Sequence, residues 1–459
     1  MVFMFCPMTT PLHSSDDLLD STCRQGDDSG PVAASKTRWW ILLTFALFSQ
    51  LQAATWNFYG PISEQIEAIQ GWSLPEIAWL ANTANLTMIV SVPLSASFVD
   101  RNGLRCPTIV CGALVSACAV LRCVRCHSTL TTDYVVAVLS MLCNGAAAGW
   151  LTFGGPVVSA AWFKATERGL ATAVVSVSPF IGQSIGFVLG PFVVPQGPAA
   201  LPGYRRLCLG EAVAACLLLV AVVLHFPERP PVPPSHTAGG AGTAVNRRRH
   251  ATPREWLRLG VVIAASAIPN GVFGGWVPVL TPNLSGFGVS ESEAAWIGCL
   301  TTLVGAAGGL IFGRLADRHP GRLKEMMLLC LCCSAVGFAW FALAANGVMP
   351  GGALVLCISG MLGGFFVNAL FPLGFEFAVE TGYPAIPEPQ AAGALLFTNT
   401  AVQIAFLGMS SGTPASSGWM NWLNVASSAL MVPLLAFFPA RYPRLAVDGI
   451  AVPSAAAHQ

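Results

Sequence analysis

Few residues of this chain could do chemistry in an apolar environment, and acids come first among them. Glu211, Glu376 and Glu380 lie at or near the ends of long stretches that are otherwise free of charge. Glu376 and Glu380 are four residues apart, so on a helix they share one face, one turn apart. Such carboxyl groups could take up and release a proton, because burial or a second carboxylate disfavours the charged form. The alternative, which we favour for Glu376 and Glu380, is that they pair with arginines and close a gate.

A second set of candidates consists of aromatic and amide side chains in the same stretches: Trp56, Asn57, Tyr59, Asn270, Phe273, Trp276, Asn399 and Gln403. A flat ring could stack between such rings, and a cation could lie on their faces. Asn399 and Gln403 share a helix face, and they either contact a solute or join two helices. Tyr59 and Trp276 could equally be residues of a membrane interface. Trp56 lies further inside its charge-free run, which favours a role in binding a solute.

Other kinds of chemistry find no support in the sequence. It contains no plausible Ser/His/Asp arrangement, no metal-ligand cluster and no Gly-x4-Gly-Lys-Ser/Thr loop for nucleotide phosphates. We therefore expect neither an enzyme nor a cofactor or metal, and no ATP-driven process. The net charge of only +1 gives no indication of a nucleic-acid partner.

The composition indicates membrane-spanning helices. Of 459 residues, 54% are hydrophobic and only 10% are charged, whereas soluble domains carry roughly 25% charged residues. A helix crosses the hydrocarbon core with about 20 apolar residues. The charge-free runs are 39–63, 77–99, 106–121, 134–163, 169–204, 212–227, 259–290, 294–313, 326–375 and 389–440. The last two are long enough for two spans each, with breaks at 347–352 and 410–418, which predicts an all-α membrane protein with twelve transmembrane helices.

The distribution of lysine and arginine predicts the orientation and the domain boundaries. With a cytosolic N-terminus, nineteen of these cations fall on the cytosolic side and four on the other, as the positive-inside rule requires. Both termini are then cytosolic. The predicted parts are a polar tail (1–37), a six-helix half (38–227), a cytosolic linker (228–254), a second six-helix half (255–440) and a C-terminal tail (441–459).

The two halves repeat at a fixed offset of 217 residues. The pattern Glu-x-Ala-Trp occurs at 76–79 and again at 293–296. The dipeptide Asp-Arg follows the second run and the eighth run, as Asp100-Arg101 and as Asp317-Arg318. Two motifs with one offset indicate a duplicated six-helix unit.

This duplicated layout resembles the major facilitator superfamily, whose halves are related by an axis along the membrane normal. Residues 313–322, Gly-Arg-Leu-Ala-Asp-Arg-His-Pro-Gly-Arg, resemble the superfamily's loop signature Gly-x3-Asp-Arg-x2-Gly-Arg. The expected role is a cytosolic latch, in which the Asp caps a neighbouring helix N-terminus and the Arg side chains pair with acids such as Glu376 and Glu380. A plain loop with positive-inside charges is the alternative.

The fifth span carries small residues four apart, at Gly182, Gly186 and Gly190. Small residues at this spacing line one face of a helix and allow a neighbouring helix to approach closely. Members of the superfamily carry a similar Gly-Pro motif on this helix. The two interpretations, a superfamily motif and ordinary close helix packing, therefore largely agree.

Longer motifs resemble solute carrier family 49. They are residues 56–62 (Trp-Asn-Phe-Tyr-Gly-Pro-Ile), 267–276, 295–298, 372–384 and 442–445 (Tyr-Pro-Arg-Leu), and the resemblance covers about residues 37–447. It implies a secondary transporter of the lysosomal membrane that exports pyridoxine (vitamin B6) together with protons by alternating access. The expected partners are this small solute, protons and membrane lipid, and we expect a monomer.

The same family leaves alternatives open. It includes carriers of choline, and haem transport has been proposed for some members. A plasma-membrane carrier of choline, another organic cation or haem is therefore the alternative, and a receptor or nutrient sensor without transport is the alternative of another class. Choline-carrying relatives keep a tryptophan matching Trp56 and a glutamine where this chain has Phe180, with Gln183 three residues further on. That departure argues against a choline-like site.

One covalent modification is predicted. Asn283-Leu-Ser285 is an N-glycosylation sequon. It lies in a loop expected to be luminal, although close to the membrane, so we predict a glycan at Asn283.

Overall fold

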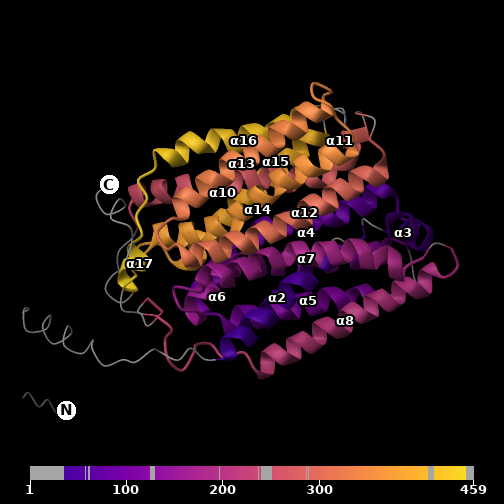
Figure 1. Cartoon of the computed structure of the whole chain (residues 1–459). Coiled ribbons are helices and arrows are strands. Elements are labelled where there is room, and N and C mark those ends of the chain that lie inside the picture. Colours follow the sequence, from indigo (N-terminus) through magenta and orange to yellow (C-terminus); the bar gives the residue numbers. More distant parts are fainter. Residues whose placement is uncertain are drawn as a thin grey trace, which may run out of the picture.

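The computed structural model describes residues 36–450, apart from 57, 60, 61, 125–129, 196, 236, 239–250, 286, 288 and 412–417. Within this part of the chain all regular elements are helical (Figure 1). Predictions on most of the N-terminal tail, on Asn57 and on the middle of the linker lie outside the described residues.

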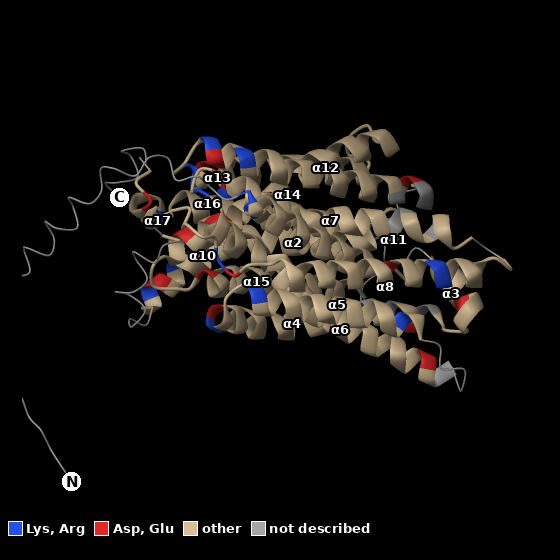
Figure 2. Ribbon diagram, turned by 90° about the horizontal axis from the view of Figure 1, so that it is seen from below, with Lys and Arg blue, Asp and Glu red and all other residues tan. Residues whose placement is uncertain are grey.

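Twelve long helices make up the described structure: α2 (Thr37–Trp56), α4 (Leu74–Asn102), α5 (Arg105–Cys123), α6 (Leu130–Trp162), α7 (Arg168–Val193), α8 (Ala200–Leu224), α10 (Pro253–Trp276), α12 (Glu291–Arg318), α13 (Leu323–Ala345), α14 (Ala353–Gly382), α15 (Glu388–Ser411) and α16 (Trp419–Ala436). The short elements are α3 (Ser63–Gln70), the 3-10 turn η2 (Val277–Val279), α11 (Leu280–Ser285) and α17 (Pro443–Val447). Nine of the long helices are long and apolar enough to cross a membrane, and α2, α4 and α16 complete the bundle. Charged residues gather toward the two ends of the bundle (Figure 2). The predicted all-α membrane fold is confirmed.

The repeat is visible where two helices begin. The Ser73 N–H donates to Glu76 Oε2 at 2.8 Å at the start of α4, and the Ser290 N–H donates to Glu293 Oε2 at 3.0 Å at the start of α12. Such capping boxes satisfy N–H groups that the first helical turn leaves free. Ser73 and Ser290 lie 217 positions apart, as do the two glutamates. The sequence repeat is therefore also a repeat of local structure.

The helix packing repeats as well. In the first half, α2 packs on α7, α4 on α6, and α5 on both α6 and α8. In the second half, α10 packs on α15, α12 on α14, and α13 on both α14 and α16. The same pairs thus recur six long helices later, so the chain forms two six-helix halves, α2–α8 and α10–α16. The exact domain boundaries stay predictions.

The halves meet mainly through α4 against α15 and α7 against α12, with further contacts of α6 with α15 and of α6 and α7 with α14. We call the end of the bundle that carries α17 the linker end; it lies at the left of Figure 1. The opposite end carries α3 and α11, at the right of Figure 1.

The boundary between the fifth and sixth spans differs from the prediction. The sequence predicts spans at 169–204 and 212–227, but α7 ends at Val193 and α8 begins at Ala200. The charge-free criterion fails here because Arg205 and Arg206 lie inside the first turns of α8 and are exposed. Long arginine side chains at a helix end can reach a polar interface.

The glycines of α7 allow α2 to approach closely, as predicted. A Cβ atom on Gly186 would lie 2.9 Å from the Ala54 carbonyl oxygen, and one on Gly182 would overlap the backbone of Gln50. The two helices therefore touch through their backbones at these positions.

Candidate substrate pathway and gate

Aromatic rings from both halves meet partway along the bundle. The Phe180 ring on α7 and the Phe371 ring on α14 have centroids 6.4 Å apart and an interplanar angle of 63°. Phe180 is half-buried, and so is Gln183, three residues further along α7. The structure thus places Phe180 at the surface where the two halves meet.

Tyr59 and Trp276, which occupy equivalent positions of the repeat, lie inside their own halves. Trp276 is fully buried, and its Nε1–H donates to Asn421 Oδ1 at 2.9 Å. Phe273 is buried beside it, with ring centroids 6.0 Å apart. Tyr59 is buried against Trp72 of the first half. In this conformation Tyr59, Phe273 and Trp276 therefore pack inside their own halves, and a role in solute binding stays a prediction for all three.

The predicted amides join helices within the second half. Asn270 Nδ2–H donates to the Val367 carbonyl at 2.6 Å, from α10 to α14. Asn399 Nδ2–H donates to the carbonyl of Ala267 at 3.4 Å, and Gln403 Nε2–H donates to that of Gly274 at 3.3 Å. These bonds support the helix-joining alternative. Trp56 is half-buried at the end of α2, and its neighbour Asn57 lies outside the described residues.

The latch aspartate of the second half caps a helix of the first. The two carboxylate oxygens of Asp317 accept from the N–H groups of Gly169 at 2.7 Å and Leu170 at 2.8 Å. These groups belong to the first turn of α7, which attracts negative charge through the helix dipole. The cap predicted from the loop signature is present, and it joins the two halves at the linker end.

The other latch residues do not behave in this way. Asp100 lies 217 positions before Asp317, yet it is exposed. Arg101 and Arg318 are exposed too, and no ion pair joins either of them to Glu376 or Glu380 among the described residues. The predicted pairing with latch arginines is therefore wrong, because these side chains extend into solvent.

Glu376 contacts the first half instead. Its Oε1 accepts from the hydroxyl groups of Ser159 on α6, at 3.3 Å, and of Thr172 on α7. Ser159 and Glu376 lie 217 positions apart.

The cation beside the two glutamates is Arg444 of α17, which the sequence analysis did not single out. Its guanidinium lies 3.8 Å from Glu376 and 3.1 Å from Glu388, and its backbone N–H donates to Glu380 Oε1 at 2.8 Å. Burial would lower the pKa of Arg444, but the surrounding carboxylates raise it above its ordinary value. A fixed positive charge therefore sits among the acids at the linker end.

Glu211 lies elsewhere, inside the first half. Its Oε2 pairs with Arg122 Nη1 at 2.6 Å, and both side chains are buried. In the sequence, Arg122 directly follows the charge-free run 106–121 and Glu211 directly precedes the run 212–227. In the structure these two charges pair with each other. The guanidinium carbon lies 3.5 Å from the centroid of the Phe58 ring. Glu211 is therefore neutralised within one half.

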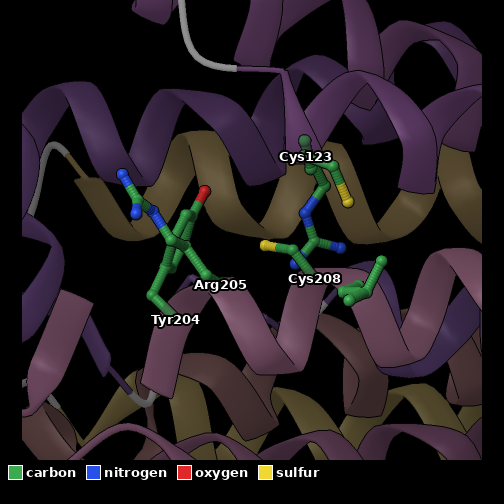
Figure 3. Close-up of a pocket in the computed structure, with 6 residues that line it drawn as sticks. Cys123, Tyr204, Arg205 and Cys208 are labelled. Carbon is green, nitrogen blue, oxygen red and sulfur yellow. The ribbon is translucent and has the colours of Figure 1, made fainter. Parts of the chain in front are cut away.

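A cavity of about 290 Å³ lies next to this ion pair, between α5 and α8. Figure 3 shows Tyr204, Arg205 and Cys208 on one helix and Cys123 on its neighbour. Since all its lining residues belong to the first half, this cavity is not the path between the halves.

The burial of Asn283 argues against the predicted glycan. Asn283 is fully buried in α11, and its Oδ1 accepts from Asn421 Nδ2–H at 3.4 Å. Its own Nδ2, the atom that would carry a sugar, is buried as well. A glycan does not fit this packing.

Comparison with known proteins identifies the class. The sequence profile of the Major Facilitator Superfamily matches residues 43–410. The fold is similar to that of the proton:xylose symporter XylE, with a TM-score of 0.67 at 16% identity over 88% of this chain and 96% of that one. It is also similar to a bacterial homologue of the iron transporter ferroportin, with a TM-score of 0.61 at 14% identity over 89% of this chain and 100% of that one. The chain belongs to the major facilitator superfamily of membrane transporters.

Within the superfamily, the chain belongs to solute carrier family 49. It is 30% identical to solute carrier family 49 member 4 homolog of Xenopus laevis over 431 residues, which cover 90% of this chain and 93% of the relative. It is 27% identical to choline/ethanolamine transporter FLVCR1 of Mus musculus, over 81% of this chain and 69% of that protein. It is a transporter rather than an enzyme.

Proposed function

We propose that this chain is a proton-coupled secondary transporter that exports pyridoxine, or a similar small aromatic solute, from the lysosome by alternating access. The observation that carries the proposal is the set of contacts by which Asp317 and Glu376 of one half bind the other half at the linker end. A bundle that is closed at one end through a few polar contacts can open there by separating its halves. Two-sided access of this kind is what a carrier needs and a sensor does not.

The linker end would face the cytosol, following the distribution of lysine and arginine. The conformation described here then has a closed cytosolic gate. Solute would enter from the opposite end, and the contacts of Asp317 and Glu376 would break as the halves rock.

The solute would bind beside Phe180 and Phe371, which touch each other edge-to-face. Aromatic rings prefer edge-to-face or offset arrangements, and a pyridine ring could pack against these two rings in this way. Phe180, Phe371 and the nearby Gln183 are uncharged, which suits a neutral solute. Trp56 at the end of α2 is a further candidate contact for the solute. Choline would need an aromatic surface for its cation, which Trp56 could also provide. The name of the FLVCR1 relative keeps choline as the alternative solute, and the plasma membrane is the alternative location.

Among the three predicted acids, Glu376 is the best candidate for coupling to protons. It touches Ser159 and Thr172 of the other half, so its surroundings change when the halves separate. Neutralising Glu376 would also weaken its attraction to Arg444. Glu211 keeps the same partner, Arg122, in any movement that leaves the first half intact.

The test is flux of labelled pyridoxine in proteoliposomes, with and without an acidic pH on the side from which the solute leaves. The proposal predicts that pyridoxine moves faster when a proton gradient points in the same direction. Equal flux with and without the gradient would contradict proton coupling. Strong competition by choline would favour the cation carrier, and no flux of either solute would favour the receptor or sensor.

A pair of variants on one helix tests the location of the site. Phe180→Ala should lower pyridoxine flux severalfold. Phe192→Ala is the matched control, because Phe192 lies on the same helix α7 but is 84% exposed. Equal flux in the two variants would place the solute elsewhere.

A further inference from the structure

A segment near the C-terminus, residues 442–448, connects the two halves at the linker end. On one side, Asp448 binds the first half and the linker. Its Oδ2 lies 2.8 Å from Arg168 Nη1, and its Oδ1 accepts from the Thr237 N–H at 2.9 Å. The side chains of Arg168 and Asp448 are both buried. If only one of these two side chains is replaced, the other charge stays buried without a partner, and the closed state is destabilised.

On its other side, the segment is attached to the second half by several contacts. Arg444 lies among Glu376, Glu380 and Glu388 of α14 and α15, as described above. The Tyr442 ring stacks on Phe377 of α14, with centroids 5.8 Å apart and an interplanar angle of 22°.

Arg168 also lies directly beside the latch. It is the first residue of α7, and the next two residues donate their N–H groups to Asp317. Its Nη2 donates to the hydroxyl groups of Ser235 and Thr237 in the linker, at 2.5 Å and 2.9 Å. The first turn of α7 is thus held by the latch, the linker and the C-terminal segment together.

We propose that residues 442–448 form a clasp of the linker-end gate, and that the gate opens when Asp448 releases Arg168 while the segment stays on the second half. The direction of release follows from the contacts. The link to the first half and the linker depends on one carboxylate, whereas the link to the second half includes three acids and a stacked ring. Arg168 and Asp448 are therefore positioning residues of the transport cycle.

Hydrogen exchange of the full-length protein without added solute tests the clasp. Asp448→Asn should speed amide exchange in the first turn of α7 by about tenfold or more, as expected when a buried charge loses its partner. Exchange in residues 443–447 should stay slow, because these residues remain attached to the second half. Glu325→Gln is the matched control, since Glu325 is an exposed acid at the same end, and it should leave both regions unchanged.

Two further variants keep the test decisive if Asp448→Asn folds poorly. Thr237→Val removes the hydroxyl that donates to Asp448 and accepts from Arg168, but it leaves the ion pair of these two residues, so it should speed exchange in the same turn by a smaller factor. Arg168→Gln combined with Asp448→Asn should exchange no faster than the faster single variant, because the two side chains act as one contact. Exchange in Asp448→Asn equal to that of Glu325→Gln, or equal acceleration in 443–447, would overturn the clasp.

The clasp rests on the proposed alternating access but not on the identity of the solute. Because exchange is measured without solute, the exchange results can be interpreted even if the protein does not transport pyridoxine. Conversely, the exchange results could support the clasp while neither pyridoxine nor choline is transported. That outcome would overturn the proposed function but not the clasp.

Discussion

The contact between Asp317 and α7 allows a quantitative test of the gate. Hydrogen bonds to a charged group contribute about 1.5–3 kcal/mol each, and Asp317 accepts two, at 2.7 Å and 2.8 Å. In Asp317→Asn the side-chain oxygen still accepts one bond, but the second bond and the attraction of the charge to the helix dipole are lost. We therefore expect a loss of about 2 kcal/mol from the closed state, which corresponds to about a 30-fold shift toward the state open at the linker end.

A cysteine at Ala173 reports this shift. Ala173 lies on α7 against α12 and is fully buried in the closed state. In the Ala173→Cys background, a membrane-impermeant maleimide applied from the linker side should react about 30-fold faster when Asp317→Asn is added, with the modified peptide identified by mass spectrometry. Asp100→Asn is the control, because Asp100 is the exposed counterpart in the repeat. The reasoning is refuted if Asp317→Asn reacts like its parent, or if Asp100→Asn has an equal effect.

Three further predictions concern the interior. Glu211→Gln leaves Arg122 buried without its partner and should destabilise the protein by about 3–5 kcal/mol; thermal unfolding in detergent measures this, and an unchanged melting temperature would contradict it. Trp56→Ala should reduce pyridoxine flux severalfold while Trp79→Ala, an exposed tryptophan, should not; unchanged flux in Trp56→Ala would move the site away from α2. Gly186→Leu should push α7 from α2 and lower the melting temperature, since a Cβ atom added at this glycine would lie 2.9 Å from a backbone oxygen, and a fully stable variant would show that the helices separate without cost.

The fold could be predicted because its signals are local or periodic. Charge-free runs give the long helices, and the repeated Glu-x-Ala-Trp pattern at 76–79 and 293–296 marks the starts of two of them. The offset of 217 residues gives the duplication. The cap formed by Asp317 also followed from a short signature, since an acid after one helix can satisfy the first turn of another.

The composition of the gate could not be predicted, because it depends on where the chain returns after α16. Nothing in the sequence indicates that Arg444 lies among three glutamates or that Asp448 meets Arg168. The stretch 442–445 was recognised only as a family motif, which is the signal that could have pointed to Arg444.

The positions of several aromatic and amide residues were also beyond the sequence. In a continuous apolar run, the sequence does not show which helix face points to the other half. Trp276 therefore gave no sign that Asn421 on α16 would provide a buried acceptor for it. The same helix buries Asn283, which the sequon alone would place at the surface.

The most direct test of the central claim is to lock the two halves together at their interface. A Cβ on Gly393 of α15 would lie 2.9 Å from the Cβ of Ala96 on α4, and a small shift brings this to the separation of about 3.8 Å found in disulfides. Oxidation of Ala96→Cys/Gly393→Cys should stop pyridoxine flux in proteoliposomes, reduction should restore it, and neither single variant should respond. Undiminished flux through the fully cross-linked protein would contradict transport by rocking of the two halves.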